Sequence, residues 1–156
     1  MPQRARRKPN ANSAKPVAAA EFDAALDALN LDAPFALAVS GGADSLALMI
    51  LAAERCKRRR SKPPTAFTVD HGLREGSAAV AARVAAWARD LGVPHRVLTW
   101  QGRKPAKNVQ ALAREARYRL IGRAMQSEGL THLLTGHTED DQAETFLLRL
   151  ARGSGL

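Results

Sequence analysis

Apolar residues along this chain follow two patterns: short continuous runs, and longer stretches in which they recur every three or four positions. The short runs are typical of strands and the longer stretches of amphipathic helices. The short runs predict strands at Phe35–Val39, Thr65–Val69, His95–Trp100 and Thr131–Thr135. The longer stretches predict helices over Val17–Leu29, from Leu46 into the basic run Arg55–Lys62, over Ala78–Leu91 and from Val109 to Met125. A last helix is expected after His137, with Phe146, Leu147 and Leu150 on its apolar side.

Polar residues, glycines and prolines mark the ends of these helices. Ser77 and Asn108 stand where they can cap the helices that follow them. Gly92 and Gly129 stand where they can end the helices that precede them. Pro63-Pro64 stops the basic helix before the second predicted strand.

Strands that alternate with helices predict an α/β fold, a doubly wound parallel sheet with helices on both faces. Ligands of such sheets bind outside the carboxyl ends of the strands. The most unusual residues of the chain follow predicted strands: Ser40–Ser45, Asp70-His71 and Gly136-His137. We therefore expect them to meet at one edge of the sheet.

Composition narrows the class of protein. The 156 residues are enough for about one domain, and 46% of them are hydrophobic. Cys56 is the single cysteine, and no Cys/His cluster has zinc-site spacing, so we expect a reducing, cytoplasmic setting. No apolar stretch approaches the ~20 residues that cross a bilayer, so no membrane partner is expected.

Charge adds a candidate partner. The 24 lysines and arginines exceed the 15 acids, which gives a net charge of +9. Residues 1–16 contain cations but no acid, which predicts a disordered basic tail before a domain over 17–156. The surplus favours a polyanionic partner such as nucleic acid, although solubility would also explain it. The run Arg55–Lys62 is either a dipole-favoured helix end or a contact with phosphates.

The strongest chemical signal is a hexapeptide after the first predicted strand, Ser40-Gly41-Gly42-Ala43-Asp44-Ser45. Its glycines let the backbone turn tightly and approach a ligand, and the next helix directs free N–H groups at the turn. These features favour phosphate binding. The Asp44 carboxylate would be costly there without a bridging cation, which predicts Mg²⁺ at Asp44. A glycine turn without any ligand is the alternative.

The hexapeptide is neither a Walker loop nor a dinucleotide fingerprint. It resembles the PP-loop, SGGxDS, of ATP pyrophosphatases, which release pyrophosphate from ATP while adenylating a substrate. Three further strings follow it in order: VDHGLR, NVQALAREARY and GHTEDDQAETFLLRLARGSG. Together, from about Phe35 to Leu156, the four motifs resemble the bacterial tRNA(Ile)-lysidine synthetase family.

The resemblance implies an ATP-dependent ligase that joins lysine to C2 of the wobble cytidine of an isoleucine tRNA with a CAU anticodon. The tRNA is first adenylated, and AMP and pyrophosphate are released. Ser40–Ser45 would hold the ATP phosphates, and Arg117, His137 and Asp141 would lie at the reacting end. The implied partners are ATP, Mg²⁺, tRNA(Ile) and L-lysine; a homodimer stays open. Family members continue well past GSGL, so we expect the amino-terminal catalytic domain, truncated at its carboxyl end.

The same residues also have structural explanations that need no ligand. Thr138 and Asp141 have capping-box spacing, and the dipole of a helix start favours acids, though not a whole cluster beside a phosphate site. Arg117 could lie on a solvated helix face.

Rival functions remain. NAD, GMP and argininosuccinate synthetases share the loop but need no strongly basic body. A PP-loop tRNA thiolase normally uses several cysteines. A non-catalytic nucleic-acid-binding domain would explain the charge but not the SGGADS loop with His137 and Asp141.

Overall fold

The computed structural model describes residues 16–31, 34–73, 76–102 and 107–137. Within them, helices and strands alternate in this order: α1 Ala19–Ala28, β1 Ala36–Ala38, α2 Ala43–Arg59, β2 Thr65–Asp70, α3 Ser77–Leu91, β3 His95–Thr99, α4 Val109–Glu128 and β4 Leu133–Thr135. The basic tail and the helix expected after His137, with Asp141, lie outside the described residues. Among the described residues, no helix is long and apolar enough to cross a bilayer.

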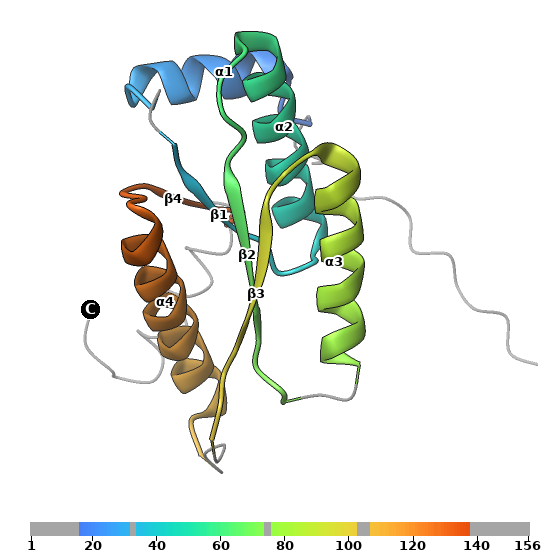
Figure 1. The fold of residues 1–156 in the computed structure, drawn as a ribbon, viewed down its shortest axis with the longest axis vertical. Coiled ribbons are helices and arrows are strands. Elements are labelled where there is room, and N and C mark those ends of the chain that lie inside the picture. The colour runs from blue at the N-terminus through green and yellow to red at the C-terminus, as the bar shows by residue number, and fades with distance from the viewer. Residues whose placement is uncertain (1–15, 32–33, 74–75, 103–106, 138–156) are drawn as a thin grey trace, which may run out of the picture.

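The strands form one parallel sheet in the order β3-β2-β1-β4. The chain moves outward from β1 to β2 and β3, then crosses back through α4 to place β4 on the other side of β1. Figure 1 shows α2 and α3 on one face of the sheet and α4 on the other. The predicted doubly wound sheet is confirmed, and its topological switch point lies between β1 and β4.

Each face of the sheet has its own apolar core, because successive side chains of a strand point to opposite faces. Leu37 of β1 and Val39, the residue that follows the strand, are buried with Met49 of α2 and Val84 of α3. On the other face, Phe67 of β2 is fully buried with Ile121 of α4. These two cores fix α2 and α4 on opposite sides of β1.

The ends of the helices partly differ from expectation. Gly92 and Gly129 end α3 and α4 in the left-handed region, as predicted. The Ser77 cap is wrong: in the described structure Gly76, at φ 87°, is the N-cap of α3, and no side chain caps it. Asn108 is the N-cap residue of α4, but at φ 52° its side chain makes no capping hydrogen bond to the described residues.

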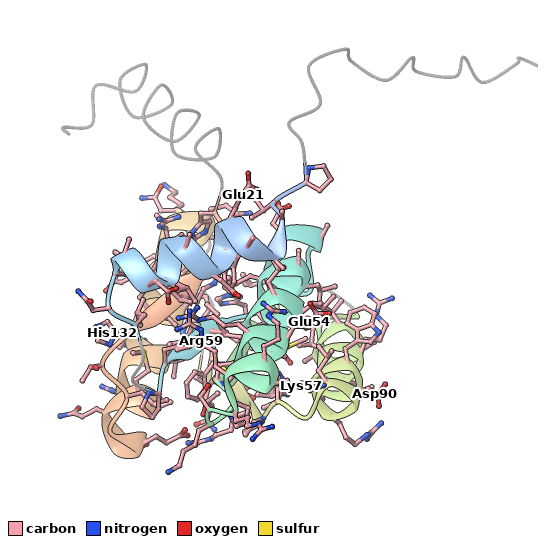
Figure 2. The ribbon with its side chains drawn as sticks, turned by 90° about the horizontal axis from the view of Figure 1, so that it is seen from above. Glu21, Glu54, Lys57, Arg59, Asp90 and His132 are labelled. Atoms are coloured by element: carbon pink, nitrogen blue, oxygen red, sulfur yellow. The ribbon has the colours of Figure 1, made fainter. Side chains whose placement is uncertain are left out.

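Helix α1 is held against α2 by ion pairs (Figure 2, where Arg59 lies beside α1). The Arg55 side chain is only 3% exposed; it donates to an Asp27 carboxylate oxygen at 2.7 Å and to the Asp23 carbonyl at 3.3 Å. Arg58 binds both carboxylate oxygens of Asp23 at 3.0 Å. The basic run therefore has a role that neither sequence interpretation included, because its arginines dock a helix.

Candidate active site

The hexapeptide connects β1 to the start of α2. The helix begins at Ala43, earlier than the Leu46 expected from the sequence, so Asp44 and Ser45 lie in its first turn. Gly42 is the N-cap residue of α2, and no side-chain cap hydrogen bond is found there among the described residues. The positive dipole end of the helix and its first amides can therefore face a ligand.

Ser45 braces this loop from within. It is buried, and its hydroxyl donates to the Gly42 carbonyl at 2.9 Å and accepts the Ser40 N–H at 3.2 Å. The Ser40 and Ser45 hydroxyl oxygens are also 3.2 Å apart. Because the Ser45 proton goes to the Gly42 carbonyl, the Ser40 hydroxyl is the donor in this contact, and it also accepts the Gly42 N–H at 3.4 Å. Both serines therefore shape the turn. Only Ser40 is exposed, so its hydroxyl can donate to a ligand in place of Ser45.

Two glycines allow close packing around the loop. Gly41 has φ +87°, and a Cβ there would lie 2.7 Å from the Val80 Cγ1 of α3. A Cβ on Gly136, after β4, would lie 2.8 Å from the Ser45 nitrogen and 2.9 Å from the Asp44 carbonyl carbon. The segment that carries His137 therefore touches the first turn of α2 with its backbone. The sequence predicted that Gly136 lies at this edge of the sheet, but it had no signal for the close contact with α2.

A cavity of about 720 Å³ opens at the carboxyl ends of the strands, within the usual size range of small-molecule sites. Its lining combines separate elements: Ser40 and Ser45 of the loop, Asp70 and His71 at the end of β2, Arg117 of α4, and His137 after β4. The expected convergence on one edge of the sheet is therefore observed. Arg117, on a helix, reaches the same cavity as the residues that follow strands.

Some predicted site residues are not brought into the cavity. Gly41, Gly42, Ala43 and Asp44 do not line it, and Asp44 is exposed beside the loop. The described residues contain no group of three or more His, Cys, Asp or Glu side chains that could hold a metal ion. One exposed carboxylate fits Mg²⁺ only as an ion shared with phosphates, the usual way that Mg²⁺ binds beside a nucleotide.

Two linked hydrogen bonds hold the end of β1, just before the hexapeptide, against β2 and β3. The Thr68 hydroxyl donates to the Val39 carbonyl at 2.8 Å and lies 2.9 Å from His95 Nε2. Since the single hydroxyl proton goes to Val39, Nε2 of His95 must be the donor to Thr68. Burial lowers the pKa of His95 below its ordinary value, which favours the neutral ring. The sequence carried no signal for this pairing.

His137 is oriented by its own strand. Its Nδ1 lies 3.0 Å from the Thr135 hydroxyl, and this contact does not involve the other ring nitrogen, Nε2. Asp70 similarly accepts the Gly72 N–H at 2.9 Å, which shapes the turn after β2.

Comparison with known proteins shows the family to which this sequence is similar. The sequence profile of the PP-loop domain matches residues 15–156. The tRNA(Ile)-lysidine synthase of Bradyrhizobium diazoefficiens is 52% identical over 143 residues, which cover 90% of this chain and 39% of that protein. The tRNA(Ile)-lysidine synthase of Rhodopseudomonas palustris is 55% identical over 121 residues, 77% of this chain and 35% of that protein. The chain thus spans less than half the length of these relatives.

Among solved structures, the fold is similar to a U34-tRNA thiolase, NcsA from Methanococcus maripaludis with its [4Fe-4S] cluster. The TM-score is 0.69 at 20% identity, over 81% of this chain and 46% of that one. At this identity the likeness establishes the fold alone.

Proposed function

The chain belongs to the PP-loop domain family, and from that premise we propose that it joins L-lysine to C2 of the wobble cytidine of an isoleucine tRNA, using ATP. The resemblance to tRNA(Ile)-lysidine synthetases, drawn above from four motifs, is confirmed by relatives that share about half of its residues. The observation that carries the proposal is the cavity at the switch point, whose lining includes Ser40, Arg117 and His137.

The first step is adenylation of the cytidine. Its C2 oxygen attacks the α-phosphorus of ATP; the new O–P bond forms as the bond to the leaving pyrophosphate breaks. Negative charge on the phosphoryl oxygens needs fixed donors and cations. The first-turn amides of α2 and the Ser40 hydroxyl are the proposed donors to the phosphates. The Arg117 guanidinium, with its planar fork of N–H groups, is the proposed cation.

The second step transfers lysine. An amine of lysine attacks C2, the C–N bond forms, and the C–O bond breaks so that AMP leaves with the former C2 oxygen. The attacking amine must lose a proton, and a nearby carboxylate or imidazole can accept it. Asp141, outside the described residues, is the proposed acceptor of this proton. The imidazole of His137, which lies four residues earlier in the same motif, is proposed to act beside it.

Mg²⁺ would be held by Asp44 together with the ATP phosphates, and it would supply charge neutralisation for the triphosphate. Every other role in the proposed reaction belongs to side chains and amides of this chain.

A thiolase is not favoured by the residues present. Iron–sulfur clusters are held by several cysteine thiolates, and these 156 residues contain one cysteine, Cys56. Its side chain is buried on α2 and does not line the cavity at the strand ends.

The test is a product assay. The chain is incubated with ATP, Mg²⁺, L-lysine and an isoleucine tRNA carrying CAU, and the digested RNA is analysed by mass spectrometry for lysine-modified cytidine. We expect pyrophosphate release that requires the tRNA, and loss of ATP binding in Asp44→Ala. Pyrophosphate release that proceeds without tRNA, or intact ATP binding in Asp44→Ala, would contradict the proposal.

A further inference from the structure

One wall of the cavity carries an aromatic–guanidinium pair that the proposed steps do not use. Arg114 and Tyr118 of α4 both line the cavity, and the Arg114 Cζ lies 5.5 Å from the centre of the Tyr118 ring. This separation is typical of a cation over an aromatic face. Tyr118 is the single tyrosine of the chain and is 36% exposed. The pair therefore offers a flat surface that a planar ligand can reach from the cavity.

We propose that Arg114 and Tyr118 form a stacking platform for the nucleobase that reacts, a pyrimidine presented by a single-stranded RNA loop. The inference rests on the proposed function and deepens it. Single-stranded bases are commonly recognised by stacking on aromatic rings and on guanidinium planes, which leaves their edges open to other groups. A base that must expose its C2 oxygen to ATP needs this mode of binding.

The placement of the platform in α4 supports this role. Arg114 precedes Arg117 by three residues, a spacing that puts their side chains next to each other on the helix, about 5–6 Å apart at Cβ. Tyr118 is one turn further on from Arg114. A base stacked on the pair would therefore have its edge beside Arg117, in the cavity that Ser40 and His137 also line.

Charge also favours an RNA ligand. Within the described part of the chain, neither Arg114 nor Arg117 forms an ion pair with a carboxylate. Unneutralised guanidinium groups attract the phosphates on either side of a loop nucleotide. The platform can thus contact the base and its backbone together.

The experiment measures binding of two anticodon stem–loop RNAs to the chain. One carries cytidine at the first anticodon position and the other an abasic nucleotide there. Stacking on one aromatic side chain typically changes affinity by about 5- to 150-fold. We therefore expect Tyr118→Leu to lower the affinity of the chain for the cytidine RNA about tenfold. On the abasic RNA the same substitution should change affinity by less than about twofold, since no base remains to stack.

Matched variants complete the design. Tyr118→Phe keeps the ring and should bind as the unmodified chain does. Arg114→Ala should lower the affinity for the cytidine RNA. Arg123→Ala removes the same charge from the same helix outside the cavity lining, and should have little effect.

Three results would overturn the platform: no RNA binding by the unmodified chain, equal losses in Tyr118→Leu on both RNAs, or a loss of ATP affinity in Tyr118→Leu without a loss of RNA affinity. The last would assign the platform to adenine. Failure of the proposed function is distinguishable, because then no lysine-modified cytidine forms even though the base-dependent effect of Tyr118→Leu persists.

Discussion

The arginines at the end of α2 and those in the middle of α4 belong to the same basic surplus but have opposite surroundings. Arg55 and Arg58 are bound by carboxylates of α1, whereas among the described residues no carboxylate pairs with Arg114 or Arg117. A guanidinium that already holds a carboxylate is a poor receptor for a second anion. The difference shows that the density of charge in a sequence does not locate an anion site, because the partners inside the fold decide which cations are available.

Replacing Arg117, which has no carboxylate partner among the described residues, should have the largest functional effect. We expect Arg117→Ala to lower tRNA-dependent pyrophosphate release by about 10²- to 10³-fold, the usual consequence of losing a fixed donor to a charged transition state. The thermal unfolding midpoint should stay unchanged, because no described ion pair is lost. Arg123→Ala is the control on the same helix. A normal rate in Arg117→Ala would remove the distinction between the two groups of arginines.

The contact between Gly136 and α2 is the next target. In Gly136→Ala, the new Cβ would lie within 2.9 Å of the backbone of Asp44 and Ser45. Overpacking of this kind costs about 1–3 kcal/mol, and the loop should shift. We expect weaker ATP binding by calorimetry.

Gly122→Ala is the matched control for that substitution. Gly122 lies inside α4, where an added Cβ meets nothing within 4 Å. Ala is favoured over Gly in a helix by about 0.5–1 kcal/mol, so this variant should be slightly more stable and bind ATP normally. Equal ATP affinity in Gly136→Ala and Gly122→Ala would contradict the claim that the contact between Gly136 and α2 shapes the ATP site.

The paired arginines should show the reverse profile, a loss of stability without a loss of binding. Arg55→Ala removes a buried side chain and one of the two arginines that pair with Asp27 in the described structure, while Arg59 keeps its own ion pair with Asp27. We expect the free energy of unfolding to fall by about 1–3 kcal/mol, measured by urea denaturation, while ATP affinity is retained. Lys57→Ala, exposed on the same helix, is the control. Weaker ATP binding in Arg55→Ala at unchanged stability would contradict the structural role of α2.

The smallest effects should appear in the pH dependence of stability, in which Asp27, the partner of the paired arginines, and half-buried His95 of β3 contribute at different pH values. Burial lowers the pKa of His95 below its ordinary 6.5, so the unfolded chain binds this proton more readily. Its contribution to stability is complete above that value and decreases as the pH falls below it. The Arg55 hydrogen bond lowers the pKa of Asp27 below its ordinary 3.8. The Asp27 contribution is therefore present above that value and is lost as the pH falls through the lowered pKa.

Urea denaturation from neutral to acidic pH measures both steps. His95→Gln should abolish the upper step and keep the lower one, and Asp27→Asn should do the opposite. An upper step that survives in His95→Gln would assign it to a different group.

Much of the fold could be predicted because it depends on local pattern. Strand and helix periodicity gave the parallel doubly wound sheet, and glycines at helix ends gave the ends of α3 and α4. The convergence of Ser40, Arg117 and His137 on one cavity agrees with the rule that ligands bind at the carboxyl ends of parallel strands. That rule needs only the order of the elements.

The remaining features depend on contacts between residues far apart in the sequence. The Thr68–His95 hydrogen bond joins neighbouring strands, and the ion pairs of Arg55 join two helices. Gly136 matters because of the backbone of Ser45, not because of its own turn. The Ser77 cap failed because Gly76 adopts a left-handed conformation at the start of α3. A single sequence has no signal that pairs such positions.

The central claim is that ATP binds in the cavity at the carboxyl ends of the strands. Amide chemical shifts during titration with ATP and Mg²⁺ test it most directly, since one experiment reports on this edge of the sheet and on the opposite edge. The account predicts that the largest shifts occur at Gly41–Ser45, at Gly136 and at His137, with little change at Ser61 and Lys62 beyond the end of α2. Shifts that cluster at Ser61 and Lys62, or the absence of shifts at Gly41–Ser45, would contradict the assignment of the cavity at the strand ends as the ATP site.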